Sequence, residues 1–341
     1  MDYKRENEMK TFERLDECYQ KAEVIEFDDS DKFILFSDVH RGDNSISDDF
    51  ATNQHLYFSA LQHYYDRGFT YIELGDGDEL WEHSSFEHIA SAHHEVFMLQ
   101  REFYRQGRMY RLFGNHDMIL RDKNWVRRNL MHFEDDYQEV ETDLFEGIEI
   151  SESLILKYRK TGDEFLLVHG HQGDLVNDQL WLPTMLSLRY FWRFLHIVGF
   201  HNPASPAKNR VKRHKIERTF SKWIYKNKKA IICGHTHRAK LAKTVELPYF
   251  NTGCCVQPRA VSGIEIEDGN LTLVQWKVEA DYNGVLRTIR KVIQGPRDIE
   301  NFLFFKNYKK WRQMYFKGNR RQKAENAFTD KLIKKVRRIL D

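Results

Sequence analysis

Five apolar runs in this chain end directly before side chains that can bind a metal ion, and this repeated pattern constrains the fold more than any other feature. The side chains that follow the runs are Asp38 and His40, Asp76, Asn115 and His116, His169, and His235 and His237. Residues 50–67 and 86–106, between the first three runs, have the apolar spacing of helices. Alternating strands and helices predict parallel strands, whose carboxyl ends lie along one edge of a sheet. We therefore expect these side chains to gather at one place.

Strand-like patterns later in the chain predict a second sheet. Residues 147–150 and 153–159 are expected to pair as a hairpin. Residues 260–267 and 271–278 are joined by an Asp-Gly-Asn sequence, which is typical of a tight hairpin turn. The predicted fold is therefore α/β, with two packed mixed β-sheets flanked by helices.

The chain is predicted to have one central domain with additions. We expect residues 1–30 to form a polar N-terminal lead-in and residues 31–280 to form the central domain. Residues 174–229 interrupt that domain as a helical cap insert, because an aromatic-rich part, a proline-containing breaker and a basic part follow one another there. Residues 281–341 are expected to form a basic helical C-terminal extension.

The predicted cluster combines carboxylate, amide and imidazole side chains. Such a mixed set of oxygen and nitrogen donors suits Mn²⁺, Fe or Zn²⁺ and differs from a thiolate zinc site. The set is too large for one ion, so we expect two divalent cations that share a bridging carboxylate. Manganese is the expected metal, with iron and zinc as alternatives. Two such cations lower the pKa of a bridging water and stabilise an in-line displacement at phosphorus.

Five ordered motifs resemble the motif set of calcineurin-like metallophosphoesterases. The motifs are Asp38-Val39-His40, Gly75-Asp76-Gly77-Asp78-Glu79, Gly114-Asn115-His116-Asp117, His169-Gly170-His171 and Gly234-His235-Thr236-His237. The resemblance covers residues 31–280 and implies a hydrolase of phosphoric ester or anhydride bonds with an α/β/β/α sandwich. The implied metal ligands are Asp38, His40 and His237 for one ion, Asn115, His169 and His235 for the other, and Asp76 as the bridge.

Three further residues are expected to take part in catalysis. The resemblance implies that His116 donates a proton to the leaving group and that Glu79 orients His116. A carboxylate beside an imidazole fixes its tautomer and supports its charged form. Arg41 follows a ligand directly and is predicted to clamp a phosphate. We expect His171 to be a supporting or structural residue, since only one imidazole of this pair is a usual ligand.

A closer resemblance, to UDP-2,3-diacylglucosamine pyrophosphatases, is carried by Gly-Asp-x-x-Glu-x-x-Glu, the insert and Gly-His-Thr-His-Arg. In those enzymes the comparable insert forms a cap with a groove for acyl chains, so Trp192 is expected to line a groove and Arg189 and Arg193 to reach a phosphate. Ordinary helix packing is the alternative for this apolar stripe. The chain departs from those enzymes at His116, where they typically carry arginine, and in its basic tail.

The last residues of the chain are strongly basic. Residues 300–341 contain 13 Lys and Arg against 4 Asp and Glu, interleaved with aromatic residues, in a chain whose net charge is +2. Such a segment can bind nucleic acid or an anionic membrane surface, or it can pack on the domain as a solvated helix. No stretch is apolar enough to predict a transmembrane helix or a secretory signal.

The predicted function is hydrolysis of a phosphate ester or pyrophosphate bond by a metal-bridging hydroxide, on a lipid- or nucleotide-linked substrate. The alternative is a nucleic-acid-binding phosphodiesterase or a phosphoprotein phosphatase that uses the basic tail. The four cysteines form no C-x-x-C pair, so we expect reduced thiols and a cytoplasmic protein, with peripheral membrane contact as an alternative.

Overall fold

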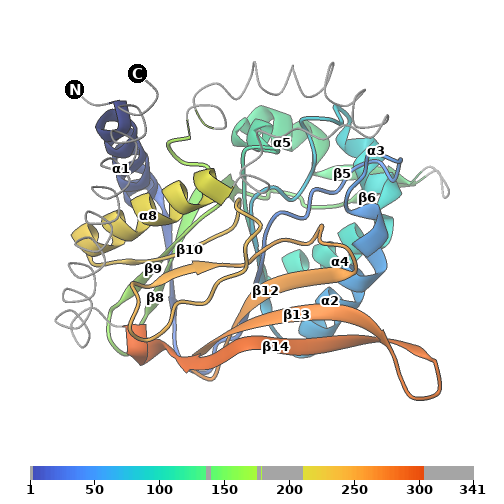
Figure 1. Ribbon diagram of the computed structural model, residues 1–341. Helices are drawn as coiled ribbons and strands as arrows, with labels where there is room; N and C mark the ends of the chain where they lie inside the picture. The colour runs from blue at the N-terminus through green and yellow to red at the C-terminus, as the bar shows by residue number, and fades with distance from the viewer. Residues whose placement is uncertain (1–2, 136–139, 175–177, 179–209, 303–341) are drawn as a thin grey trace, which may run out of the picture.

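The computed structural model describes residues 3–135, 140–174, 178 and 210–302 (Figure 1). The predicted substrate residues Arg189, Trp192 and Arg193 lie outside the described residues. So do residues 303–341 of the predicted C-terminal extension and most of the predicted insert at 174–229.

The larger sheet has seven strands and is parallel in one half and antiparallel in the other. Its strands, in spatial order, are β14 (Leu286–Asp298), β13 (Asn270–Ala280), β12 (Ala260–Glu267), β2 (Phe33–Phe36), β3 (Thr70–Leu74), β4 (Met109–Leu112) and β7 (Ile150–Ser151). Strands β2, β3, β4 and β7 run parallel. Strands β12, β13 and β14 are antiparallel to their neighbours, and β12 joins β13 through the predicted hairpin turn.

The smaller sheet is also mixed. Its strands, in spatial order, are β1 (Glu23–Phe27), β8 (Ser153–Tyr158), β9 (Glu164–Val168), β10 (Ala230–Cys233) and β11 (Tyr249–Asn251). Strands β8 and β9 are antiparallel, and the other neighbours are parallel. A separate antiparallel pair consists of β5 (His132–Asp135) and β6 (Val140–Asp143). The predicted fold with two mixed sheets is confirmed.

One strand pairing and the extent of the sheets differ from the expectation. The hairpin predicted between residues 147–150 and 153–159 is wrong, because β7 joins the larger sheet and β8 the smaller one. The chain therefore passes from one sheet to the other at Glu152, between the two strands. The sheets also extend beyond residues 31–280, since β1 precedes that range and β14 follows it. The expectation of a helical extension from residue 281 is therefore wrong at Leu286–Asp298, which is a strand.

Helices cover the outer faces of both sheets (Figure 1). Helices α2 (Gln54–Asp66) and α4 (His94–Arg105) pack on the larger sheet, and α1 (Tyr3–Lys21) and α8 (Arg210–Asn227) pack on the smaller one. The remaining helical elements of the described residues are η1 (Ala51–Asn53), α3 (Phe86–Ala92), η2 (Met118–Arg121), α5 (Lys123–Asn129) and η5 (Ile299–Phe302). Among the described residues there is no helix with the length and apolar character that crossing a bilayer requires.

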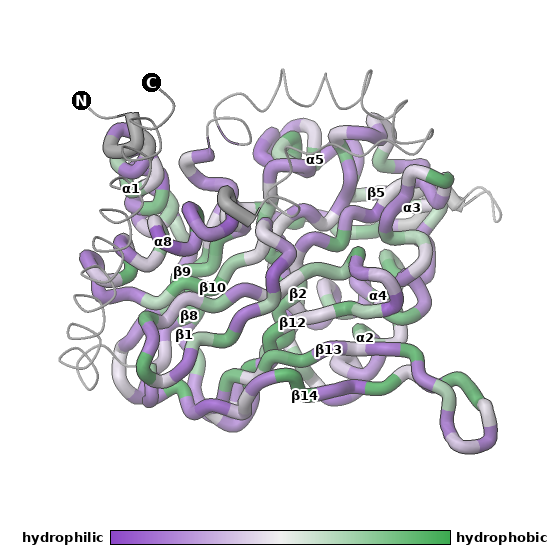
Figure 2. The backbone as a smooth tube through the Cα atoms, in the orientation of Figure 1, coloured by the Kyte–Doolittle hydropathy of each residue, from purple (hydrophilic) through white to green (hydrophobic). Residues whose placement is uncertain are grey.

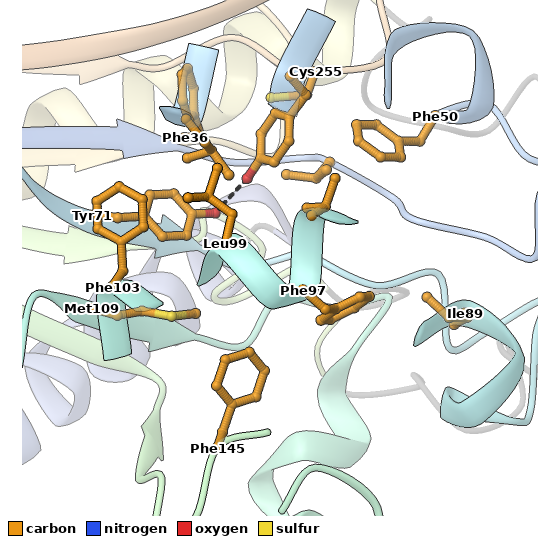
Figure 3. Close-up of a cluster of buried hydrophobic side chains, with 14 of the residues drawn as sticks. Phe36, Phe50, Tyr71, Ile89, Phe97, Leu99, Phe103, Met109, Phe145 and Cys255 are labelled. Carbon is orange, nitrogen blue, oxygen red and sulfur yellow. Dashed lines mark hydrogen bonds between the residues drawn. The ribbon is translucent and has the colours of Figure 1, made fainter. Parts of the chain in front are cut away.

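Alternate side chains of the central strands enter different apolar layers. Along β2, Phe33 and Leu35 belong to the layer between the two sheets, and Ile34 and Phe36 belong to the layer under α2 and α4. Figure 3 shows the second layer, in which the rings of Phe36 and Tyr71 lie 6.4 Å apart. Both faces of β2 are buried, which explains why its sequence is a continuous apolar run. In Figure 2 the central strands are accordingly more hydrophobic than the outer helices.

A truncation in the layer between the sheets is expected to destabilise the domain. Leu35 is fully buried in that layer, so Leu35→Ala removes apolar contacts and leaves a cavity. We expect the free energy of unfolding to fall by about 2–5 kcal/mol, measured by urea denaturation followed through tryptophan fluorescence. Val278→Ala is the control, because Val278 is 41% exposed and surface substitutions usually change stability by less than about 0.5 kcal/mol. Equal losses in the two variants would contradict this description of the core.

Candidate metal centre

The predicted ligands meet where strands of both sheets end. They follow β2, β3 and β4 of the larger sheet and β9 and β10 of the smaller one. The larger sheet supplies Asp38, His40, Asp76 and Asn115, and the smaller sheet supplies His169, His235 and His237. The cluster therefore lies at the seam between the sheets, and neither sheet contains it alone.

Three groups of ligand atoms lie close enough together to hold a cation. Within each group the atoms are within 4.8 Å of one another, and the groups are Asp38 with His40 and His237, His40 with Asp76 and His116, and Asp76 with His169 and His235. Asp76 Oδ2 lies 3.0 Å from His169 Nε2 and 3.8 Å from His40 Nε2. Asp76 therefore lies between ligands from the two ends of the cluster, where a bridging carboxylate would have to lie.

Four ligand atoms are buried without a hydrogen-bond partner in the part of the chain that the structure describes. They are His40 Nε2, Asn115 Oδ1, His169 Nε2 and His235 Nε2. A buried polar atom without a partner costs about 1–3 kcal/mol, so four such atoms in one cluster require a common partner. Imidazole nitrogen and amide oxygen are donors that Mn²⁺, Fe and Zn²⁺ accept. The residues present thus fit divalent cations.

Hydrogen bonds fix the tautomers of two of these imidazoles. His40 Nδ1 lies 2.8 Å from Glu79 Oε2, and His169 Nδ1 lies 2.9 Å from the carbonyl oxygen of Leu74. An ionised carboxylate and a carbonyl can only accept, so Nδ1 carries the hydrogen in both rings. The Nε2 lone pair of each ring is therefore left for a cation.

The backbone is strained where the ligands lie. Five predicted ligands have φ between 50° and 63°, namely Asp38, His40, Asp76, His235 and His237. This left-handed region is uncommon for residues other than glycine, and such strain concentrates at functional sites. These residues follow the ends of β2, β3 and β10.

Two motif glycines allow the strand ends to approach one another. A Cβ atom at Gly114 would overlap with Asp76 Oδ1, and one at Gly234 would overlap with Asp38 Oδ2. No side chain fits at either position without moving a carboxylate of the cluster.

Buried carboxylates control the protonation of the neighbouring imidazoles. Burial alone lowers the pKa of His169, but Asp76 and Asp38 outweigh burial and raise this pKa to about 9. Burial alone raises the pKa of Asp38, but His237 and His169 outweigh it and lower this pKa to about 2. The carboxylates are therefore ionised at neutral pH and favour positive charge beside them.

Cation binding is expected to release protons. Without a cation, the raised pKa of about 9 keeps the His169 imidazole in its doubly protonated, charged form at neutral pH, whereas an imidazole ligand must be neutral. The apparent affinity for Mn²⁺ should therefore increase with pH and level off above about 9. Calorimetric titration of the metal-free protein at neutral pH, in two buffers of different ionisation enthalpy, measures the number of protons released. Binding without proton release would contradict the arrangement of Asp76 and His169.

His116 lies at the accessible side of the cluster. Its Nδ1 is 2.8 Å from Glu79 Oε1, and its ring stacks on Trp81 with the ring centroids 4.5 Å apart. The His116 side chain is 24% exposed, against 10% for His40. Burial alone lowers the pKa of His116, but Glu79 and Asp76 raise it to about 9.

Sequence reasoning missed two of these contacts. Glu79 contacts His40 as well as His116, so one carboxylate holds two imidazoles of the cluster. The stacking of Trp81 on His116 was also not predicted. The spacing of Glu79 and Trp81 by two residues was the only signal for that contact, and it is too common to be specific.

The prediction that Arg41 clamps a phosphate is wrong. Its side chain is fully buried, and its nitrogens lie 2.8 and 2.9 Å from the two oxygens of Glu73 and 2.7 Å from Asp78 Oδ1. Arg111 reaches the same two carboxylates from β4. The guanidinium of Arg41 is therefore committed to a buried ion cluster beneath the site. Glu73, an acid within an otherwise apolar strand, was the signal that a buried basic partner exists.

Comparison with known proteins agrees with this geometry. Residues 31–239 match the family model for calcineurin-like phosphoesterases. The match begins before the first predicted ligand, Asp38, and includes the last one, His237. No curated protein matches the chain.

Proposed function

The chain belongs to the calcineurin-like phosphoesterase family, and from this premise we propose that it hydrolyses its substrate with two cations held around Asp76. Family membership makes the protein a metal-dependent hydrolase of phosphoric esters. The observation that carries the proposal for two cations is the membership of Asp76 in two different ligand groups. The bond cleaved is a phosphate ester or a pyrophosphate.

We assign the ligands from the resemblance of the motifs, and the close groups of atoms support the assignment for every ligand except Asn115. Asp38, His40 and His237 would hold one cation, Asn115, His169 and His235 the other, and Asp76 would contact both. When bound, the cations lower the pKa of the attacking water and stabilise charge on the phosphoryl group. Manganese is the proposed metal, with iron and zinc as alternatives, because carboxylate, amide and imidazole donors without a thiolate suit all three.

His116 is the proposed general acid. Glu79 holds its Nδ1–H, so its Nε2 is the atom that gives a proton to the oxygen of the leaving group. Glu79 and Asp76 keep the imidazole protonated at neutral pH by raising its pKa to about 9. Stacking on Trp81 restricts rotation of the ring, which keeps Nε2 in one direction.

The direct test is hydrolysis of simple phosphate esters. The purified full-length protein, loaded with Mn²⁺, should hydrolyse an aryl phosphate monoester or the corresponding diester. Activity should disappear with EDTA and return with Mn²⁺, and the ratio of the two rates defines the ester class. Turnover that persists under strong chelation would contradict the proposal.

The substrate class is proposed from the sequence of the insert. Arg189, Trp192 and Arg193 would bind a lipid- or nucleotide-linked substrate. The test compares kcat/KM for a lipid-linked nucleotide diphosphate with kcat/KM for a water-soluble one, in the wild type and in Trp192→Ala. If the ratio of the two kcat/KM values is the same in the wild type and in Trp192→Ala, the insert has no role in choosing the substrate.

The basic tail is proposed to bind an anionic partner. Deletion of residues 303–341 should weaken binding to short RNA or to anionic vesicles, with a steep dependence on salt concentration. Equal binding by the shortened and full-length proteins would remove the tail from the proposal.

A further inference from the structure

The buried imidazole of His171 has no hydrogen bond although it lies beside the metal ligands. Its ring centroid is 5.6 Å from that of His169 and 6.4 Å from that of His235. The residue is fully buried, and neither ring nitrogen has a partner among the described residues. His169, by contrast, uses its Nδ1 to donate to a backbone carbonyl.

A purely structural role does not account for this environment. Two unpaired nitrogens in a buried ring cost about 1–3 kcal/mol each, whereas an apolar ring of similar size would cost nothing of this kind. A buried histidine elsewhere in the fold shows the usual alternative. His93 has partners for both nitrogens, with Asp48 Oδ2 at 2.8 Å and Gln54 Oε1 at 3.1 Å.

His171 is also not placed as a cation ligand. The group formed by Asp76, His169 and His235 does not include it, and neither does any other group found among the described residues. The His171 ring is therefore near the proposed cations, but its nitrogens do not belong to any group of atoms that could jointly bind a cation.

The loop that carries His171 is held firmly on its outer side. The backbone N–H of Gly170 donates to Gln172 Oε1 at 2.9 Å, and that of Gly173 donates to Asp178 Oδ2 at 2.9 Å. Arg14 of α1 donates from Nε to the same oxygen of Asp178 at 3.0 Å.

Helix α1 anchors this loop by packing as well as by charge. A second nitrogen of Arg14, Nη2, lies 2.6 Å from Glu152 Oε1, where the chain passes between the sheets. Thr11 lies so close to Gly173 that a Cβ atom there would overlap with it. The backbone thus fixes the place of the His171 ring, although the ring itself has no partner.

We infer that His171 donates a hydrogen bond to a non-bridging oxygen of the substrate's phosphoryl group. An imidazole has at least one N–H to donate, and a phosphoryl oxygen is a strong, anionic acceptor. This inference rests on the proposed function, because it requires a phosphoryl group beside the cations. His171 is then a catalytic residue. It follows β9 and binds the phosphoryl group that the water attacks.

The test uses binding of inorganic phosphate to the full-length, Mn²⁺-loaded protein, measured by calorimetry, together with kcat, KM and metal content. His171→Phe should keep the metal content of the wild type, bind phosphate about 10- to 100-fold more weakly and lose a similar factor in kcat/KM. His171→Gln and His171→Asn retain an N–H donor, and at least one of them should recover part of the loss. They also keep the test valid if the phenylalanine variant does not fold.

The matched control is His93→Phe, which removes a buried histidine whose nitrogens are both paired. It should lower thermal stability and leave phosphate affinity unchanged. Wild-type phosphate affinity in His171→Phe would overturn the inference while leaving the proposed function intact. Loss of metal from all three His171 variants would overturn it by making His171 a ligand. A wild-type protein that neither binds phosphate nor hydrolyses esters would refute the proposed function itself.

Discussion

Asp76→Ala is expected to abolish metal-dependent hydrolysis in a protein that still folds. Asp76 belongs to two of the three ligand groups, and its Oδ2 lies 3.0 Å from His169 Nε2. Its Oδ1 accepts a hydrogen bond from the backbone N–H of His116 at 2.8 Å, so it also positions the proposed acid. Asp76→Ala removes the carboxylate that the two proposed cations would share. Since loss of a single stabilising group at a transition state costs about 10²–10³-fold, we expect a loss of about 10³-fold or more.

The measurement is kcat/KM for an aryl phosphate ester with Mn²⁺, together with the metal content of the purified variant. Asp268→Ala is a matched control, because Asp268 has the same φ of 51° as Asp76 but lies in the turn between β12 and β13. Both variants place alanine in a left-handed conformation, so the comparison separates backbone strain from ligand loss. An Asp76→Ala protein with metal content and turnover close to wild type would refute the assignment of the bridging ligand.

His116→Ala is expected to lower kcat by about 10²–10⁴-fold without loss of metal, because general acid catalysis contributes this much. The loss should depend on the leaving group. An ester of p-nitrophenol leaves readily without protonation, whereas an alkyl phosphate needs a proton on the departing oxygen. The variant should therefore retain far more of its activity on the p-nitrophenyl ester than on the alkyl ester.

Two outcomes would contradict this role for His116. An equal loss on both esters would mean that His116 does not protonate the leaving group. Loss of metal would make His116 a ligand, which the close group of His40, Asp76 and His116 would then explain. Glu79→Gln is a useful companion variant when its metal content is also measured, because it weakens the contacts at Nδ1 of both His116 and His40 and leaves both imidazoles in place.

Much of the cluster was predictable because parallel strands place their carboxyl ends together. An apolar run followed by a polar residue locates both a strand and its end, as at Leu74 and Asp76. The alternation of such runs with helices was enough to predict which side chains would meet. The resemblance to the phosphoesterase motifs added the pairing of His116 with Glu79, and His116 Nδ1 lies 2.8 Å from Glu79 Oε1.

The remaining features depend on contacts that local sequence patterns do not encode. Arg41 follows a ligand, yet its guanidinium turns away to Glu73, which lies 32 positions along the chain. The hairpin expected before β9 failed because local alternation does not reveal which of two sheets a short strand joins. The helix expected over residues 86–106 is divided at His93, whose side chain contacts Asp48, a residue 45 positions away.

The origin of the ligands in two different sheets has a consequence for the whole protein. Cations bound at the seam would cross-link the two sheets at the ends of β2 and β10. A species that binds only the folded chain raises its stability in proportion to the logarithm of its concentration. Scarcity of metal in a cell would therefore reduce the amount of intact protein as well as its turnover, since a loosened sandwich is removed by proteases.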